Sequence, residues 1–169
     1  MDARLLRAAL IVSIFCCLGA SYRTRNFMVT AATPDLAREV CEEAERFRRE
    51  LALDWLGQEL APWPAPCPIQ VKVGPRLGAG GATSFAFNGR YPMHWQMEVF
   101  GSRERVLDSV LPHEVMHTVF ATHFGQPLPR WADEGACTTV EHHSERDKHK
   151  KLLVRFLKTG KGIPFTRMF

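Results

Sequence analysis

Hydrophobic residues in the first half of the chain recur with a helical period and then with a strand period. From Thr33 to about Leu56 the apolar positions, beginning at Leu36 and Val40, have helical spacing, and charged residues fill the opposite side. Thr33 is a suitable N-cap, and Pro34 suits the first helical position. We therefore expect an amphipathic helix that packs through one side and leaves its charges in water.

Alternating or continuous apolar runs predict four strands. Residues 69–73 alternate apolar and polar side chains, which is typical of a half-buried strand. Asn88-Gly89 is a strong turn signal between two further strands, although Pro92 suggests that the returning strand begins late. The four prolines of residues 61–68 predict a linker. The expected strands are residues 27–32, 69–73, 82–87 and 93–100.

The second half reads as a series of helices. Ser102 can cap the first, and Pro112 predicts a kink or a restart because it lacks a backbone N–H. Gly125 suits the left-handed residue that ends the next helix. We expect two more helices at residues 131–142 and 145–157. The last is basic, and we interpret its charges as a solvated face in preference to a membrane-surface or acidic-partner site.

Composition indicates an ordinary globular domain. The chain has 169 residues, of which 46% are hydrophobic and 24% charged, and its formal net charge is +4. It carries no nucleic-acid-binding signature, so we expect no nucleic-acid partner. Residues 1–20 combine a basic start with an apolar run ending in Ala20, which predicts a signal peptide or an N-terminal anchor. We therefore expect an exported protein, periplasmic, cell-envelope or extracellular, whose membrane contact is limited to this segment if it stays uncleaved.

Three cysteines lie beyond residue 20. An exported protein can keep a disulfide, and Cys41 with Cys67 is the pair we consider. We interpret Cys137 as a buried small apolar residue.

The strongest chemical signal is His113-Glu114-Val115-Met116-His117. Histidines four residues apart lie on one side of a helix, where both imidazoles can bind one divalent cation, most often Zn²⁺. Glu114 would then project beside the metal and suits a general base for water. Glu134 is the natural third ligand, because a hydrolytic zinc keeps three protein ligands and leaves the fourth position to water. Glu141, two turns later on nearly the same side, is a rival.

These residues resemble the gluzincin metallopeptidases, and within them the peptidase MA-like domains. There HExxH is followed by a WxxEG segment whose glutamate completes the zinc site, and Trp131, Glu134 and Gly135 match it. The resemblance implies a zincin-like α+β domain over residues 21–169, with a small mixed sheet, an edge strand over the HExxH helix and a following glutamate helix. By comparison with gluzincin domains, we expect residues 21–169 to be a C-terminally incomplete domain.

The resemblance also implies where a peptide binds. In gluzincins the edge strand before HExxH pairs with the substrate backbone, a role assigned here to Gly81, Ala82, Thr83, Ser84 and Phe85; a plain structural hairpin is the alternative. Aminopeptidase-N-like enzymes carry a Gly-x-Met-Glu-Asn motif in this strand. This chain has no carboxylate there, which favours an endopeptidase. Glu98 stays open as an alternative carboxylate for the free amine of a substrate.

We therefore expect zinc-dependent peptide-bond hydrolysis by metal-activated water, with Glu114 as the general base. Peptides or proteins would be the substrates. His142 is our first candidate for the donor that stabilises the oxyanion, with His143 and Tyr91 as alternatives. Asp133 or Thr138 can orient a metal-bound imidazole. The alternative function is a non-catalytic, metal-bound peptide-binding module.

Overall fold

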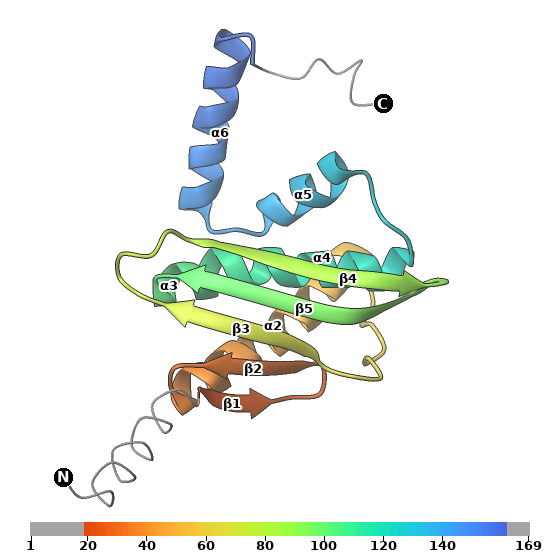
Figure 1. Ribbon diagram of the computed structural model, residues 1–169. Coiled ribbons are helices and arrows are strands. Elements are labelled where there is room, and N and C mark those ends of the chain that lie inside the picture. Colours follow the sequence, from red (N-terminus) through yellow and green to blue (C-terminus); the bar gives the residue numbers. More distant parts are fainter. Residues whose placement is uncertain (1–18, 162–169) are drawn as a thin grey trace, which may run out of the picture.

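The computed structural model describes residues 19–161. These residues form a five-stranded mixed sheet in the order β1-β2-β3-β5-β4, and helices α2 and α4 lie along one face (Figure 1). Strands β2, β3 and β5 are parallel, and the edge strands β1 and β4 are antiparallel to their neighbours. The strands are β1 (Ala20–Arg23), β2 (Phe27–Ala31), β3 (Cys67–Val73), β4 (Gly80–Asn88) and β5 (Tyr91–Gly101). The helices are α2 (Pro34–Leu56), α3 (Arg103–Arg105), η2 (Val106–Val110), α4 (Leu111–Phe124), α5 (Arg130–Thr139) and α6 (His143–Lys158).

This architecture confirms the expected α+β class and the small mixed sheet. Residues 1–18, which hold most of the expected signal peptide or anchor, lie outside the described residues. Ala20, the last residue of that segment, already pairs with Ala31 in the sheet. Between residues 19 and 161, no helix combines the length and apolar character needed to cross a membrane.

The core lies between the sheet and helices α2 and α4. Strand register places Val29 beside Ile69 and Ile69 beside Met97, so their side chains share one face. All three are almost fully buried. Burying a side chain of this size contributes about 1.5–3 kcal/mol. The helices supply Val40 and Ala44 from α2 and Val115, Met116 and Val119 from α4 to the same core. The α4 side chains on this side leave its other side for the candidate site.

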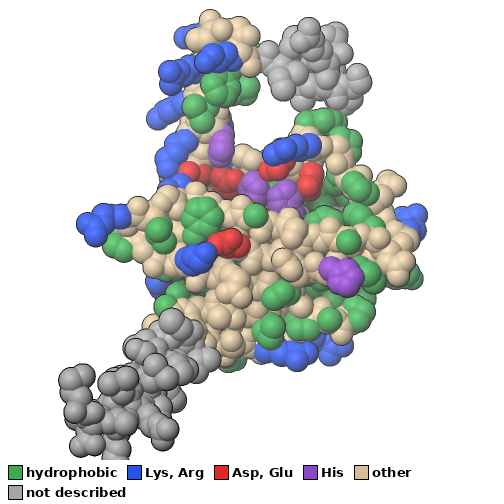
Figure 2. All heavy atoms as spheres, in the orientation of Figure 1, with side chains coloured by type: hydrophobic (Ala, Val, Ile, Leu, Met, Phe, Trp, Pro, Cys, Tyr) green, Lys and Arg blue, Asp and Glu red, His purple; other side chains and the backbone are tan. Residues whose placement is uncertain are grey.

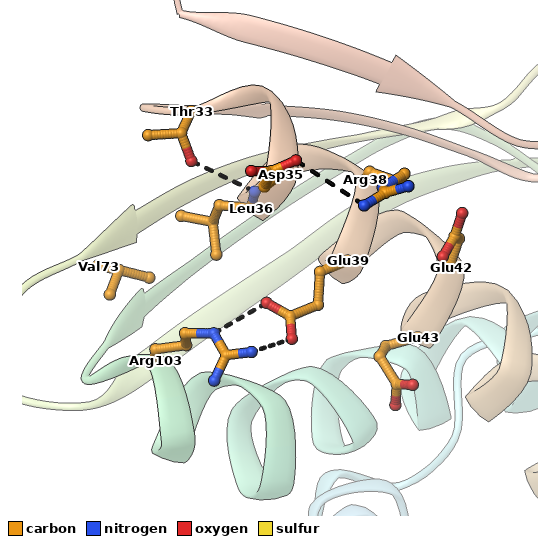
Figure 3. A pocket seen from close by; sticks show the side chains of 9 residues that line it. All are labelled: Thr33, Asp35, Leu36, Arg38, Glu39, Glu42, Glu43, Val73 and Arg103. Carbon is orange, nitrogen blue, oxygen red and sulfur yellow. Dashed lines mark hydrogen bonds and ion pairs between the residues drawn. The ribbon is translucent and has the colours of Figure 1, made fainter.

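The beginning of α2 is capped and tied to the segment that leads into α4. The Thr33 hydroxyl accepts a hydrogen bond from the Leu36 backbone N–H at 3.3 Å, which confirms the expected N-cap. Figure 3 shows the Arg103 guanidinium forked onto the Glu39 carboxylate of α2, with Nε 2.9 Å from one oxygen. This ion pair joins α2 to α3 near the end of β5. An exposed pair contributes at most about 1 kcal/mol, so its effect is chiefly positional.

The helix before the histidines changes pitch where Pro112 requires it. Residues 106–110 form a π-helical turn, and the Leu111 N–H donates to the Val106 carbonyl. Proline has no N–H for the usual hydrogen-bond ladder, so the wider turn absorbs the irregularity before α4 begins. Gly125 ends α4 in the left-handed conformation, with φ of 62°. Both expectations for this helix are confirmed.

Several elements differ from the sequence prediction. Strand β1 was not predicted, and β3 begins at Cys67, inside the expected linker, because its backbone joins the ladder beside Phe27. Pro92 lies within β5 and pairs with Phe87, so the returning strand does not begin late. An edge-of-ladder position tolerates the missing N–H. Helix α5 ends at Thr139, before the expected residue 142.

The proposed Cys41–Cys67 disulfide is wrong. Both thiols are free and buried. The Cys41 thiol lies 3.5 Å from the Phe27 carbonyl oxygen, whereas the Cys67 thiol lies 3.7 Å from the Pro68 carbonyl oxygen. Each sulfur therefore has its own backbone acceptor, and no disulfide joins the two.

Candidate metal centre

His113 and His117 leave α4 on the same side, as their spacing of four residues requires. Their ring centroids are 5.1 Å apart. The two side chains are only 17% and 13% exposed, yet both line a cleft of about 420 Å³. In Figure 2 the purple histidines of this region lie beside red acidic side chains between the sheet edge and helices α5 and α6.

Three elements build this cleft. Helix α4 forms its floor, the edge strand β4 forms one wall and α5 forms the other. Its lining includes Gly81, Ala82, Thr83, Phe85, His113, Glu114, His117, Arg130, Asp133 and Glu134. The structure therefore brings the predicted ligands, the predicted base and four of the five predicted strand residues together. Ser84 instead lines a groove on the open face of the sheet.

Each imidazole is oriented by a carboxylate. His113 Nδ1 lies 2.7 Å from Glu141 Oε1, and His117 Nδ1 lies 2.9 Å from Asp133 Oδ2. Carboxylates in this position fix the ring and leave Nε2 for a metal. Asp133 thus stands where we expected an orienting residue. Glu141, considered above as a rival ligand, contacts Nδ1 of His113 and not the Nε2 that is left for a metal. The Thr138 hydroxyl, the other residue expected to orient an imidazole, instead donates to the Glu134 carbonyl at 2.8 Å.

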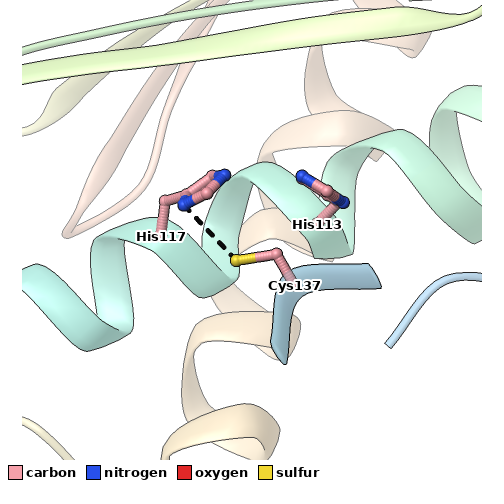
Figure 4. A group of neighbouring side chains, drawn as sticks. All are labelled: His113, His117 and Cys137. Carbon is pink, nitrogen blue, oxygen red and sulfur yellow. Dashed lines mark hydrogen bonds between the residues drawn. The ribbon is translucent and has the colours of Figure 1, made fainter. Parts of the chain in front are cut away.

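Two candidates lie near the imidazoles as a third donor. Glu134 Oε2 is 3.6 Å from His113 Nε2, and its side chain is 45% exposed. Cys137 Sγ is 3.3 Å from His117 Nδ1 and fully buried. His113, His117 and Cys137 form a group that can hold a metal ion, because their donor atoms lie within 4.8 Å of one another (Figure 4). Cys137 is buried, as the sequence predicted, but it is also a neighbour of the imidazole pair.

Glu114 is held between α4 and β4. Its side chain is almost fully buried, and Oε2 accepts a hydrogen bond from the Thr83 hydroxyl at 2.7 Å. The close approach depends on Gly81, where an added Cβ would lie 2.7 Å from Glu114 Oε1 and 2.9 Å from the Glu98 carbonyl oxygen. Gly81 lies in strand β4 and pairs with Val99 of β5, so its backbone position is fixed by the sheet.

Burial and neighbouring charges shift three pKa values in the site. Burial raises the pKa of Glu114, although the Thr83 hydrogen bond and both imidazoles act against it. Burial by itself would lower the pKa of His113, but the Glu141 hydrogen bond and nearby carboxylates outweigh it, so the pKa is raised. Burial also raises the pKa of Cys137, and Asp133 and Glu134 add to this shift. The thiol is therefore neutral near pH 7, whereas Glu134 offers an exposed carboxylate.

A second, smaller cavity of about 280 Å³ adjoins the cleft on the other side of His113 and Glu114. Arg105, Glu145 and His149 line it, together with Glu141. Glu141 Oε2 lies 3.4 Å from His149 Nε2, and Arg105 pairs with Glu145 at 2.9 Å. Sequence reasoning missed Arg105, Glu145 and His149, because a charged residue in a charged helix carries no signal of where it points.

The expected oxyanion donors lie elsewhere. His142 Nδ1 accepts from the Ser144 N–H at 3.4 Å and caps α6, and its ring contacts the His143 ring at an angle of 50°, with centroids 4.0 Å apart. Tyr91 is 78% exposed and lines an apolar cavity beside Trp63. None of these rings lines the cleft. Glu98 pairs with Lys72 at 2.7 Å and lines the groove on the open sheet face.

Comparisons with protein-family models, with curated proteins and with solved structures found no match to this chain. What the site does is therefore inferred from its residues and their geometry.

Proposed function

We propose that this protein binds one Zn²⁺ ion through His113, His117 and Glu134 and hydrolyses peptide bonds. The observation that carries the proposal is the convergence of both imidazoles, a buried Glu114 and Glu134 on one cleft beside an edge strand. Two neutral imidazoles and one carboxylate make a donor set that suits zinc. The resemblance to gluzincins, limited to HExxH and WxxEG, agrees with this donor set.

The hydrogen bonds of the imidazoles favour Glu134 over Cys137 as the third ligand. Both Nδ1 atoms already contact carboxylates, which leaves the Nε2 atoms for the ion. Glu134 lies on the Nε2 side of His113 at 3.6 Å, whereas Cys137 lies on the Nδ1 side of His117. Two light-atom ligands of a tetrahedral zinc stand about 3.3 Å apart, given bonds of roughly 2.0–2.1 Å. The 3.6 Å between Glu134 Oε2 and His113 Nε2 is close to this value.

Glu114 is the proton acceptor and donor in this proposal. Zinc, when bound, supplies Lewis-acid activation of water and of the substrate carbonyl. Glu114 takes the proton of the attacking water and passes it to the leaving amine. Burial suits this role because it brings the pKa of the carboxyl closer to neutrality. The Thr83 hydroxyl holds one carboxylate oxygen of Glu114 by a hydrogen bond. The position of the other oxygen is therefore fixed as well.

The edge strand supports a peptide as substrate. Among the described strands, β4 pairs only with β5, so its outer edge offers backbone groups to an extended chain. This edge borders the cleft at Gly81 and Thr83. The strand carries no carboxylate to hold a free amine, and Glu98 faces Lys72 instead. An endopeptidase is therefore favoured over an aminopeptidase.

The second candidate is a metal-bound, non-catalytic peptide-binding module. It is favoured by the burial of Glu114, which is only 5% exposed and already hydrogen-bonded to Thr83, so water reaches it with difficulty. In this reading the same edge strand binds the peptide and no bond is cut.

Glu114→Gln separates the two functions. A mixed peptide library is incubated with the zinc-loaded wild type and with the variant, and new amino termini are counted. The proposal expects the variant to keep zinc and to lose about 100-fold or more of the rate, the contribution typical of a general base. A zinc-loaded wild type that cuts nothing supports the binding module, and a fully active variant contradicts the role of Glu114.

A further inference from the structure

Helix α6 has one apolar side that no described element covers. Leu152, Leu153, Phe156 and Leu157 follow one another at positions i, i+1, i+4 and i+5, which places them on the same side of the helix. Their exposed fractions run from 42% for Phe156 to 65% for Leu157. Single exposed leucines are common on protein surfaces, but three leucines and a phenylalanine on one helical side form a continuous patch.

The opposite side of α6 is basic. Lys148, Lys151, Arg155 and Lys158 stand at i, i+3, i+7 and i+10, which again is one side of a helix. Lys148 pairs with Glu145 at 2.6 Å. No carboxylate of residues 19–161 forms an ion pair with the other three. Figure 2 shows blue basic and green hydrophobic side chains exposed along this helix.

The helix projects from the rest of the fold (Figure 1). No residue of α6 is buried, and its polar contacts with the body lie towards its N-terminal end, at Glu145, Arg146 and His149. Isolated helices of this length are marginal in water, because helices in proteins gain most of their stability by packing an apolar side. Within residues 19–161, the apolar side of α6 therefore has no packing surface that would stabilise it.

The charged side chains of α6 indicate which kind of partner would cover its apolar side. A second copy of α6 packed through this apolar side would cover the leucines but leave the basic rows of both helices on the outside, without any counter-charge. An anionic bilayer satisfies both sides of the helix, since acyl chains receive the leucines while long basic side chains reach the headgroups. We propose, in place of the solvated face expected from the sequence, that α6 lies in the headgroup region of anionic lipid and brings the domain to a membrane surface. This contact is independent of the proposed hydrolysis.

Vesicle binding tests the proposal on the full chain. Binding is measured by flotation with vesicles of phosphatidylcholine alone and with a phosphatidylglycerol fraction added. The wild type should bind the anionic vesicles, gain helicity there by circular dichroism, and dissociate as salt is raised. Leu153→Gln/Leu157→Gln should weaken this binding about tenfold or more. The control Leu53→Gln/Leu77→Gln makes the same change at two exposed leucines outside α6, which are 42% and 46% exposed, and should bind as the wild type does.

Two double variants that each remove two positive charges test the basic side of α6. Lys151→Gln/Lys158→Gln should weaken binding about tenfold or more, whereas Arg49→Gln/Arg76→Gln, outside α6, should have a much smaller effect. Phe156→Trp reports insertion, through emission that shifts to shorter wavelength on anionic vesicles. The proposal is overturned if the α6 variants bind as tightly as their controls, because binding then comes from another segment. It is equally overturned if the leucine variant abolishes a dimer in solution without changing vesicle binding.

Discussion

His113 Nδ1 lies 2.7 Å from a carboxylate oxygen of Glu141, which follows it by 28 residues. Glu141 stands between α5 and α6, and its other oxygen lies 3.4 Å from His149 of α6. The Glu141 carboxylate thus orients a candidate ligand and connects α6 to α4, the helix that carries His113 and His117.

Removing this carboxylate should weaken metal binding without abolishing it. Partners that orient a metal ligand typically account for 10–100-fold in affinity. We therefore expect Glu141→Ala to lower zinc affinity by about 10–100-fold and Glu141→Gln, which keeps a hydrogen bond, by less. Competition with a chelating dye measures both. Glu104→Ala changes an exposed glutamate of α3 and serves as the control; equal affinities in Glu141→Ala and the control would refute the orienting role.

The third ligand can be identified by two substitutions. If Glu134 completes the site, Glu134→Ala should lower zinc affinity by more than the roughly 10–100-fold attributed to an orienting partner. Cys137→Ser should change it little, because the serine hydroxyl preserves volume and leaves the Nε2 side untouched. The reverse order of losses would assign the site to His113, His117 and Cys137.

Local patterns in the sequence predicted the parts of the site that lie on one element. The spacing of His113 and His117, the Thr33 cap and the Gly125 end of α4 all follow from rules that act within a few residues. Glu134 is on another helix, and its place in the same cleft was expected from the resemblance of the WxxEG segment to gluzincins. The other predictions needed no knowledge of how distant segments pack.

Contacts between distant segments were beyond such patterns. Glu141 reaches His113 only because the loop after α5 turns back over α4, and that path has no local signal. The Cys41–Cys67 pair was plausible by count, but thiol direction is set by tertiary packing. Strand β1 is short and exposed, with no alternation that distinguishes it from a loop.

Thr83 should act as a positioning residue for Glu114. A hydrogen bond to a charged group contributes about 1.5–3 kcal/mol, so its loss frees the carboxylate to move. Thr83→Val should lower kcat about tenfold or more, with zinc content unchanged and KM little affected. Thr83→Ser keeps the hydroxyl and should recover most of the rate. The positioning role fails if valine and serine variants turn over alike.

The core thiols should react slowly and only at high pH. Burial raises the pKa of Cys67 from 9.0 to about 12, and burial also raises that of Cys41. Alkylation requires the thiolate, so at pH 8 both should label much more slowly in the folded protein than in urea. Because the folded pKa is raised, the free energy of unfolding should fall as pH rises above 9. Peptide mass mapping after timed iodoacetamide exposure measures the rates; fast native labelling of Cys67 would show that it is not buried.

Zinc titration of the metal-free protein tests the central claim most directly. Calorimetry compares the wild type with His113→Ala, His117→Ala and His123→Ala, the last altering an exposed histidine of the same helix outside the cleft. The account predicts one tightly bound zinc for the wild type and for His123→Ala, and binding that is lost or weakened by orders of magnitude in the other two. A wild type that binds no zinc, or equal binding by all four proteins, would contradict it.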